Sequence, residues 1–279
     1  MYPILFSIGG FTLYSFSLLL VVSWSVWSFV FWKKLRKYAV SDERIFDLMF
    51  FTTIVAFLFS RLSFVVTHVD TFVDNWLKVG ALWVAPGLSF YGALISGILT
   101  LFFLARAYKI RFGYILDSFV MSFSFASIVG LIGSFLDGTT VGTLSSLPWA
   151  LPYVGHLSKR HPIQVYEILV YLLLICLLFI LEKKSNKDHW QFGILAAWYF
   201  FGFAIMMFGV EFFKENDLYI HQLTIQQWIL IAIFAESCGV LYIACGGRQK
   251  MRSVVVFIYQ NTRRFVGNLY EKLPKKRTG

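Results

Sequence analysis

The chain has 279 residues, of which 58% are hydrophobic and 14% charged, and its mean hydropathy is +0.69. A soluble domain of this length could not bury so much apolar side chain, which excludes the soluble globular classes and predicts an integral membrane protein. The formal net charge of +10 is interpreted as a membrane-topology signal plus a basic tail, so nucleic acid is not expected as a partner.

Seven apolar stretches are long enough to cross a bilayer, because each crossing needs about 20 mostly apolar residues. We predict helices, since backbone groups inside lipid must be paired internally and the stretches lack the alternation of barrel strands. The predicted fold class is therefore all-α, a polytopic bundle of seven transmembrane helices. The spans are expected at about 11–31, 45–67, 86–105, 114–136, 163–181, 190–212 and 225–245.

Lysine and arginine gather after the first, third and fifth spans and after the seventh, and these segments hold most of the 25 basic residues. Loops rich in these residues stay in the cytoplasm. We therefore predict the amino terminus outside and the carboxyl terminus inside. The expected domains are a transmembrane domain over 1–247, with an external arm at about 137–162, and a basic cytoplasmic tail over 248–279.

Small residues mark the third and fourth spans. The third opens with them at positions 92, 93, 96 and 97, a pattern typical of close helix packing, which also places Tyr91 near the outer leaflet. The fourth ends in a glycine-rich stretch over 130–138 that includes Ser134 and Asp137. For these glycines, close packing and a functional role are both open.

The densest polar motif is Arg-His-Pro-Ile-Gln-Val-Tyr-Glu at 160–167, which leads directly into an apolar stretch. Polar groups that enter a membrane are costly and usually functional. If residues 163–181 form a helix, Gln164, Glu167 and Tyr171 share one face, which should line a cavity or the bundle interior.

Other charged residues also fall within or beside spans. Glu211 lies near the outer boundary of the sixth span with Lys214 close enough to pair, and Arg61 lies at a similar depth in the second. Glu236 is alone in the seventh span, where we expect a hydrogen bond to a neighbouring helix.

The polar residues named so far come from different spans and should converge near the outer half of the bundle. Such a cavity suits a phospholipid headgroup, with Arg61 and Arg160 as phosphate partners. The scattered histidines and cysteines form no ligand pattern, so neither a metal nor a cofactor is expected. The converging set is Arg61, Tyr91, Ser134, Asp137, Arg160, His161, Tyr166, Glu167, Glu211 and Lys214.

Five blocks, at 2–9, 88–95, the glycine-rich end of the fourth span, 160–167 and 210–214, are similar to those of one family in the same order. The chain thus resembles the prolipoprotein diacylglyceryl transferases, bacterial inner-membrane enzymes of lipoprotein biosynthesis, over nearly its whole length. The positions that match are Gly133, Phe135, Gly142, Arg160, His161, Pro162, Gln164, Tyr166, Glu167 and Glu211.

The resemblance implies transfer of a diacylglyceryl group from phosphatidylglycerol to the lipobox cysteine of a lipoprotein precursor. The expected partners are phosphatidylglycerol or another anionic phospholipid, the precursor's signal peptide and the membrane. We take Tyr91, Glu211 and His161 as catalytic candidates. The candidates for binding lipid or phosphate are Arg61, Ser134, Gly142, Arg160, Tyr166 and Glu167.

Several polar positions of the family differ here: its arginines are Leu131 and Met207, its histidine is Tyr91, its asparagine is Ser134 and its glutamate is Thr139. Losing one charge-assisted hydrogen bond in a dry site costs about 2–4 kcal/mol of transition-state stabilisation. Three alternatives stay open: a transferase with a rebuilt phosphate clamp, a catalytically silent relative that binds phospholipid or signal peptide, and an unrelated transporter.

The predicted orientation can be tested with a reporter enzyme that is active only outside the cytoplasm. The reporter should be inactive when fused after Gly279 and active when inserted near Trp149, because the basic loops hold the carboxyl terminus inside. The opposite pattern would overturn the orientation.

Overall fold

The computed structural model describes residues 2–9, 11–82, 84–138, 140–153, 155, 157–215 and 219–247. Their long helices are α1 (Ser15–Leu35), α2 (Asp42–Thr67), α3 (Phe90–Ala107), α4 (Phe112–Asp137), α5 (Ile163–Asp188), α6 (Ile194–Glu211) and α7 (Ile225–Ala244). Three short 3-10 helices are η1 (Arg36–Tyr38), η2 (Val69–Thr71) and η3 (Trp76–Val79). The expected tail over 248–279 and Thr139 lie outside the described residues.

The described residues also form three antiparallel hairpins, one before α1, one between α4 and α5, and one between α6 and α7. They are β1 (Ile4–Ile8) with β2 (Phe11–Tyr14), β3 (Leu151–Pro152) with β4 (Lys159–Arg160), and β5 (Tyr219–Ile220) with β6 (Leu223–Thr224).

The seven long helices are each long and apolar enough to cross a membrane. This confirms the predicted class, a membrane bundle of seven helices. Many large apolar side chains point outward along them, as expected where lipid and not water is the solvent. Which end of the bundle faces the cytoplasm stays a prediction.

The first helix begins at Ser15 and not at position 11, so the predicted start was wrong. Residues 11–14 instead form strand β2, whose last residue Tyr14 pairs with Ile4. Gly9 has a φ of +60° and allows the chain to turn back between the strands. Two glycines between short apolar runs are a hairpin signal that hydropathy alone does not detect.

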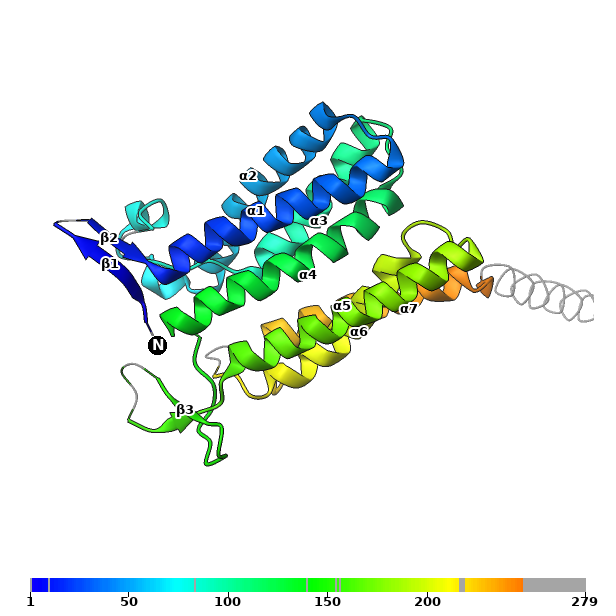
Figure 1. Cartoon of the computed structure of the whole chain (residues 1–279). Coiled ribbons are helices and arrows are strands. Elements are labelled where there is room, and N and C mark those ends of the chain that lie inside the picture. The colour runs from blue at the N-terminus through cyan, green and yellow to red at the C-terminus, as the bar shows by residue number, and fades with distance from the viewer. Residues whose placement is uncertain are drawn as a thin grey trace, which may run out of the picture.

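The helices form two groups, α1 to α4 and α5 to α7 (Figure 1). Within the first, α2 packs on α3 and α1 on α4; within the second, α5 packs on α6 and α6 on α7. Helix α4 also contacts α5 and α6, so it connects the groups. The strands β1, β2 and β3 lie at one end of the bundle (Figure 1).

Small residues in α3 and α4 permit close helix contacts. A Cβ added at Gly92 would lie 2.4 Å from Oγ of Ser63 in α2, and one at Gly133 would lie 2.9 Å from Cβ of Leu19 in α1. Both additions would force a neighbour to move. The packing interpretation of these glycines therefore holds in the structure.

Glu236 was predicted to form a hydrogen bond between helices, but its side chain is exposed on α7. Among the described residues the structure gives it no hydrogen-bond partner. The hydropathy pattern located the acid within a span but could not show which face of the helix it occupies.

A buried carboxylate joins α4 to the start of α6. Asp117 accepts hydrogen bonds from the backbone N–H of Gly193, 2.8 Å away at Oδ2, and of Ala196, 2.9 Å away at Oδ1. The first N–H groups of a helix lack partners within it, and a negative charge there is favourable. Asp117 thus caps α6 from a different helix.

We predict that Asp117→Ala lowers the midpoint of thermal unfolding in detergent by several degrees. The two N–H groups would lose a charged acceptor, and a hydrogen bond of that kind contributes about 1.5–3 kcal/mol. Asp188→Ala is the control, because Asp188 is exposed at the end of α5. Equal shifts in the two variants would contradict the capping role.

Candidate functional site

The ammonium of Lys214 lies between two carboxylates at the arm end of α5 and α6. Its Nζ is 2.6 Å from Oε1 of Glu167 and 3.1 Å from Oε2 of Glu211. Glu167 lies near the start of α5, and Glu211 is the last residue of α6. These three residues, the Lys214 cluster, confirm the predicted pairing of Glu211 with Lys214 and add Glu167.

Two opposing effects act on the pKa of Lys214. Burial alone would lower this pKa, but the carboxylates of Glu167 and Glu211 outweigh burial, so the pKa is raised. Tyr91 is also near enough to act on the ammonium electrostatically. Lys214 therefore stays protonated between the two carboxylates.

Residues 141–145 pair with the chain on both sides and bring the motif to the cluster. The N–H of Thr143 donates to the carbonyl of Phe213 at 2.8 Å, and the carbonyl of Thr143 accepts from the N–H of His161 at 3.1 Å. This short segment therefore lies between the end of α6 and strand β4.

Gly142 occupies the closest approach in this arrangement. It forms a backbone bridge with Lys214, and a Cβ added there would lie 2.4 Å from the carbonyl oxygen of His161. Only glycine fits without moving the backbone of the motif. Gly142, which we predicted as a lipid or phosphate contact, thus has a positioning role in the structure.

Arg160 extends from β4 across the same segment. Its Nη1 donates to the carbonyl of Gly142 at 3.0 Å and to Oε2 of Glu215 at 2.6 Å. Its Nε is buried and, within the described part of the chain, has no hydrogen-bond partner. The Nε–H of Arg160 is therefore left without an acceptor among the described residues.

His161 and Tyr166 belong to a second polar chain. Nδ1 of His161 lies 3.0 Å from the hydroxyl of Tyr166, which accepts from Nε1 of Trp149 at 2.8 Å. The ring of Phe213 packs against both, with centroids 5.0 Å from His161 and 6.0 Å from Tyr166. Trp149 thereby ties the arm to α5.

Gln164 anchors the start of the arm. Its Nε2 donates to the carbonyl of Thr140 at 2.8 Å, and its Oε1 accepts from the hydroxyl of Tyr153 at 2.9 Å. Burial raises the pKa of Tyr153, which keeps the phenol protonated as a donor. The hydroxyl of Ser134 lies 3.4 Å from that of Thr140, so this candidate adjoins the anchor.

The motif face predicted for α5 is confirmed. Gln164, Glu167 and Tyr171 are all buried on the inner side of the helix.

The guanidinium of Arg61, by contrast, binds a different part of the molecule. It donates to the carbonyls of Lys78, Val79 and Gly87 at 2.8, 2.8 and 2.9 Å.

Arg61 therefore holds the connection between α2 and α3. Its hydrogen bonds among the described residues all go to that connection, and the structure does not join it to the Lys214 cluster. Depth in a span, from which we predicted its role, does not reveal that backbone carbonyls surround it.

Three of the positions that depart from the family pattern lie in or against the hydrophobic core. Met207 and Tyr91 are 5% and 7% exposed within the hydrophobic core, and Leu131 packs against that core. These side chains supply no cation, whereas Lys214 and Arg160 bring positive charge to this end of the bundle. Thr140, Trp149 and Glu215 were not among our candidates, because their contacts come from chain pairing that no local motif signals.

An apolar hollow of about 650 Å³ adjoins this polar network. The arm, the start of α5 and the end of α6 all contribute to its wall. The lining residues are Leu147, Trp149, Leu151, His161, Pro162, Val165, Tyr166, Leu169 and Phe213. Apolar walls with a few polar groups are typical of sites for amphiphilic ligands.

The profile of one family, described as prolipoprotein diacylglyceryl transferase, matches residues 3–243. Relatives named phosphatidylglycerol–prolipoprotein diacylglyceryl transferase include that of Wolbachia sp. subsp. Brugia malayi, 27% identical over 86% of this chain and 92% of the relative. That of Finegoldia magna is 26% identical over 82% and 90%, and that of Bordetella avium 31% identical over 67% and 72%.

We predict that Lys214→Met destabilises the protein, since Glu167 and Glu211 would lose their shared cation. Breaking a buried ion pair by removing one partner costs about 3–5 kcal/mol. The thermal unfolding midpoint should fall clearly, and less so for Lys214→Arg. Adding Glu167→Gln and Glu211→Gln to Lys214→Met should restore part of the loss. No recovery would show that repulsion between the carboxylates is not the cause.

Proposed function

The chain belongs to the prolipoprotein diacylglyceryl transferase family, and we propose that it transfers the diacylglyceryl group of phosphatidylglycerol to the cysteine thiol of a prolipoprotein. Family membership and seven membrane-spanning helices make it a multi-pass protein of the bacterial inner membrane. The single observation that carries the proposed chemistry is the Lys214 cluster at the arm end of α5 and α6.

The proposed reaction forms one bond and breaks another. The sulfur of the cysteine attacks the glyceryl carbon that bears the phosphate, a thioether C–S bond forms, and the C–O bond to the phosphate breaks. Glycerol phosphate leaves with the bonding electrons, and the thiol proton passes to a base. The site must therefore supply a proton acceptor and cations that stabilise the leaving phosphate.

Glu211 is the proposed proton acceptor and Lys214 the principal phosphate partner. Glu211 is 2% exposed, and the ammonium of Lys214 lies beside its carboxylate. When a phosphate enters, the ammonium can exchange one carboxylate partner for a phosphate oxygen. That exchange frees a carboxylate beside the reacting thiol, which couples lipid binding to base activation.

Arg160 is the proposed second phosphate partner, because its buried Nε is uncommitted among the described residues. Glu167 would share the ammonium during exchange, and Tyr91 would contribute a hydroxyl nearby. His161 and Tyr166 form the polar edge of the apolar hollow, which we assign to an acyl chain or to the apolar part of a signal peptide.

A catalytically silent relative is the second candidate. The observation that favours it is the packing of Leu131, Met207 and Tyr91 in or against the hydrophobic core, where the family has two arginines and a histidine. Such a protein would hold phospholipid or signal peptide at the same place without completing the transfer.

The two candidates separate in one assay. Purified protein is mixed with phosphatidylglycerol and a lipobox-cysteine peptide, and the mass of the peptide is followed over time. We expect a diacylglyceryl mass gain, and a loss of at least about a hundredfold in rate for Glu211→Gln, as for removal of a general base.

Glu236→Gln is the matched control, because it makes the same chemical change at an exposed position on α7. It should retain the rate of the unsubstituted protein. No mass gain in the unsubstituted protein, with phosphatidylglycerol still bound, would establish the silent relative instead.

A further inference from the structure

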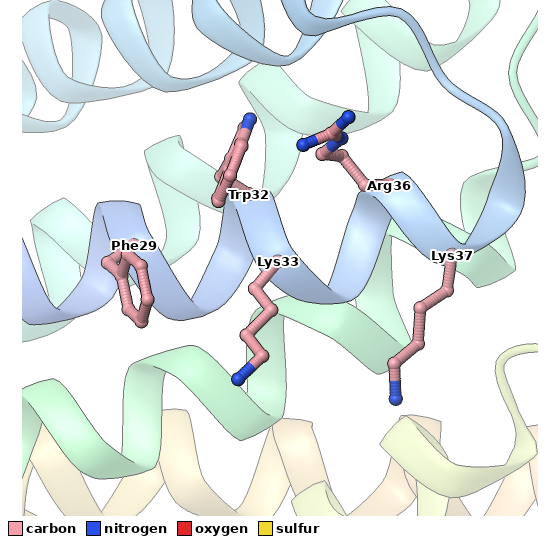
Figure 2. Close-up of a pocket in the computed structure, with 5 residues that line it drawn as sticks. All are labelled: Phe29, Trp32, Lys33, Arg36 and Lys37. Atoms are coloured by element: carbon pink, nitrogen blue, oxygen red, sulfur yellow. The ribbon is translucent and has the colours of Figure 1, made fainter.

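A second hollow, this one lined by basic and aromatic side chains, lies at the end of α1, at the opposite end of the bundle from the arm (Figure 1). It measures about 400 Å³ and is lined by the last turns of α1 together with η1. Figure 2 shows two rows of side chains around it: Phe29, Lys33 and Lys37 on one side of the helix, and Trp32 and Arg36 on the other. Each row follows the helical spacing of four residues.

Lys33 and Lys37 differ from the two basic residues beside them in sequence. Lys34, between them in sequence, pairs with Glu182 of α5 at 2.6 Å, and Arg36 lies 3.4 Å from Asp42. For Lys33 and Lys37 the structure gives no ion pair within the residues it describes. The hollow therefore carries an excess of positive charge.

The aromatic residues of the hollow fix its depth relative to the membrane. Phe29 is exposed on the apolar part of the span, and Trp32, one turn nearer the end, donates from Nε1 to Asp42 at 2.9 Å. Tryptophan with a polar partner is typical of the boundary between acyl chains and headgroups. The lysines follow Trp32 toward the end of the helix, which is the level at which lipid phosphates are expected.

We propose that this hollow binds the headgroup of an anionic phospholipid, with the phosphate between Lys33 and Lys37 and the first acyl carbons against Phe29. Charge complementarity determines the class of ligand. A zwitterionic lipid carries its own cation, which competes with the lysines for the phosphate, whereas a net negative headgroup gains from both lysines. Basic pockets at the ends of membrane helices bind anionic headgroups in this way.

The site is distinct from the proposed transfer site and does not depend on the transfer reaction. It also differs from a plain topology signal, which requires basic residues near a span but no hollow that joins them to aromatic side chains. Lys183 and Lys187 provide the comparison. They are also four residues apart and exposed, and they lie near the end of α5. The ion pair between Lys34 and Glu182 places this part of α5 beside the end of α1.

The test places a photoreactive benzophenone side chain at position 29 in the full chain. The protein is reconstituted in vesicles of equal parts phosphatidylglycerol and phosphatidylcholine and irradiated. Mass spectrometry of the peptide then gives the ratio of the two lipids attached. We expect the attached ratio of phosphatidylglycerol to phosphatidylcholine to exceed the vesicle ratio by about 25-fold, with about fivefold lost for each lysine removed.

Lys33→Gln combined with Lys37→Gln should return the ratio to that of the vesicle, while Lys183→Gln combined with Lys187→Gln should leave it enriched. High salt should also erase the enrichment in the protein that carries only the photoreactive group, without any lysine substitution. Equal attachment of both lipids, enrichment that survives the first pair, or equal loss in both pairs would overturn the proposal.

Discussion

The ion pairs of Lys214 join the end of α6 to the start of α5. Two carboxylates from separate helices, Glu167 and Glu211, approach one point that is largely shielded from water. Without a cation between them, repulsion and lost hydration would separate α5 from α6 at this end. Because Lys214 also forms a backbone bridge with Gly142, the residue whose charge joins the two helices also contacts the arm through its backbone.

The motif at 160–167 thus combines support and chemistry in the same residues. Arg160 and Gln164 bind the arm, His161 packs on Phe213 after α6, and Glu167 completes the cluster. A site assembled in this way is rigid because its side chains are fixed by several partners, which favours preorganised electrostatics. It also means that substitutions in the motif change stability and activity together, so each must be judged by both measurements.

Hydropathy predicted the seven helices because lipid-facing segments must be both apolar and long. It missed the β1–β2 hairpin, where residues 11–14 are as apolar as a span but follow a glycine turn. The motif at 160–167 was found because polar groups beside a span are conspicuous. The contacts of Arg61 with backbone carbonyls and of Arg160 with Glu215 could not be predicted, since they depend on segments far apart in sequence.

The cap that Asp117 provides for α6 bears on how the chain is built into the membrane. Its two N–H partners lie 76 and 79 residues later in the chain, at the start of α6, and a ribosome delivers α4 long before α6. A carboxylate in lipid without partners is costly. Asp117 therefore gains its hydrogen bonds only when α6 is in place, so this polar contact between the two helices forms late in the synthesis of the chain.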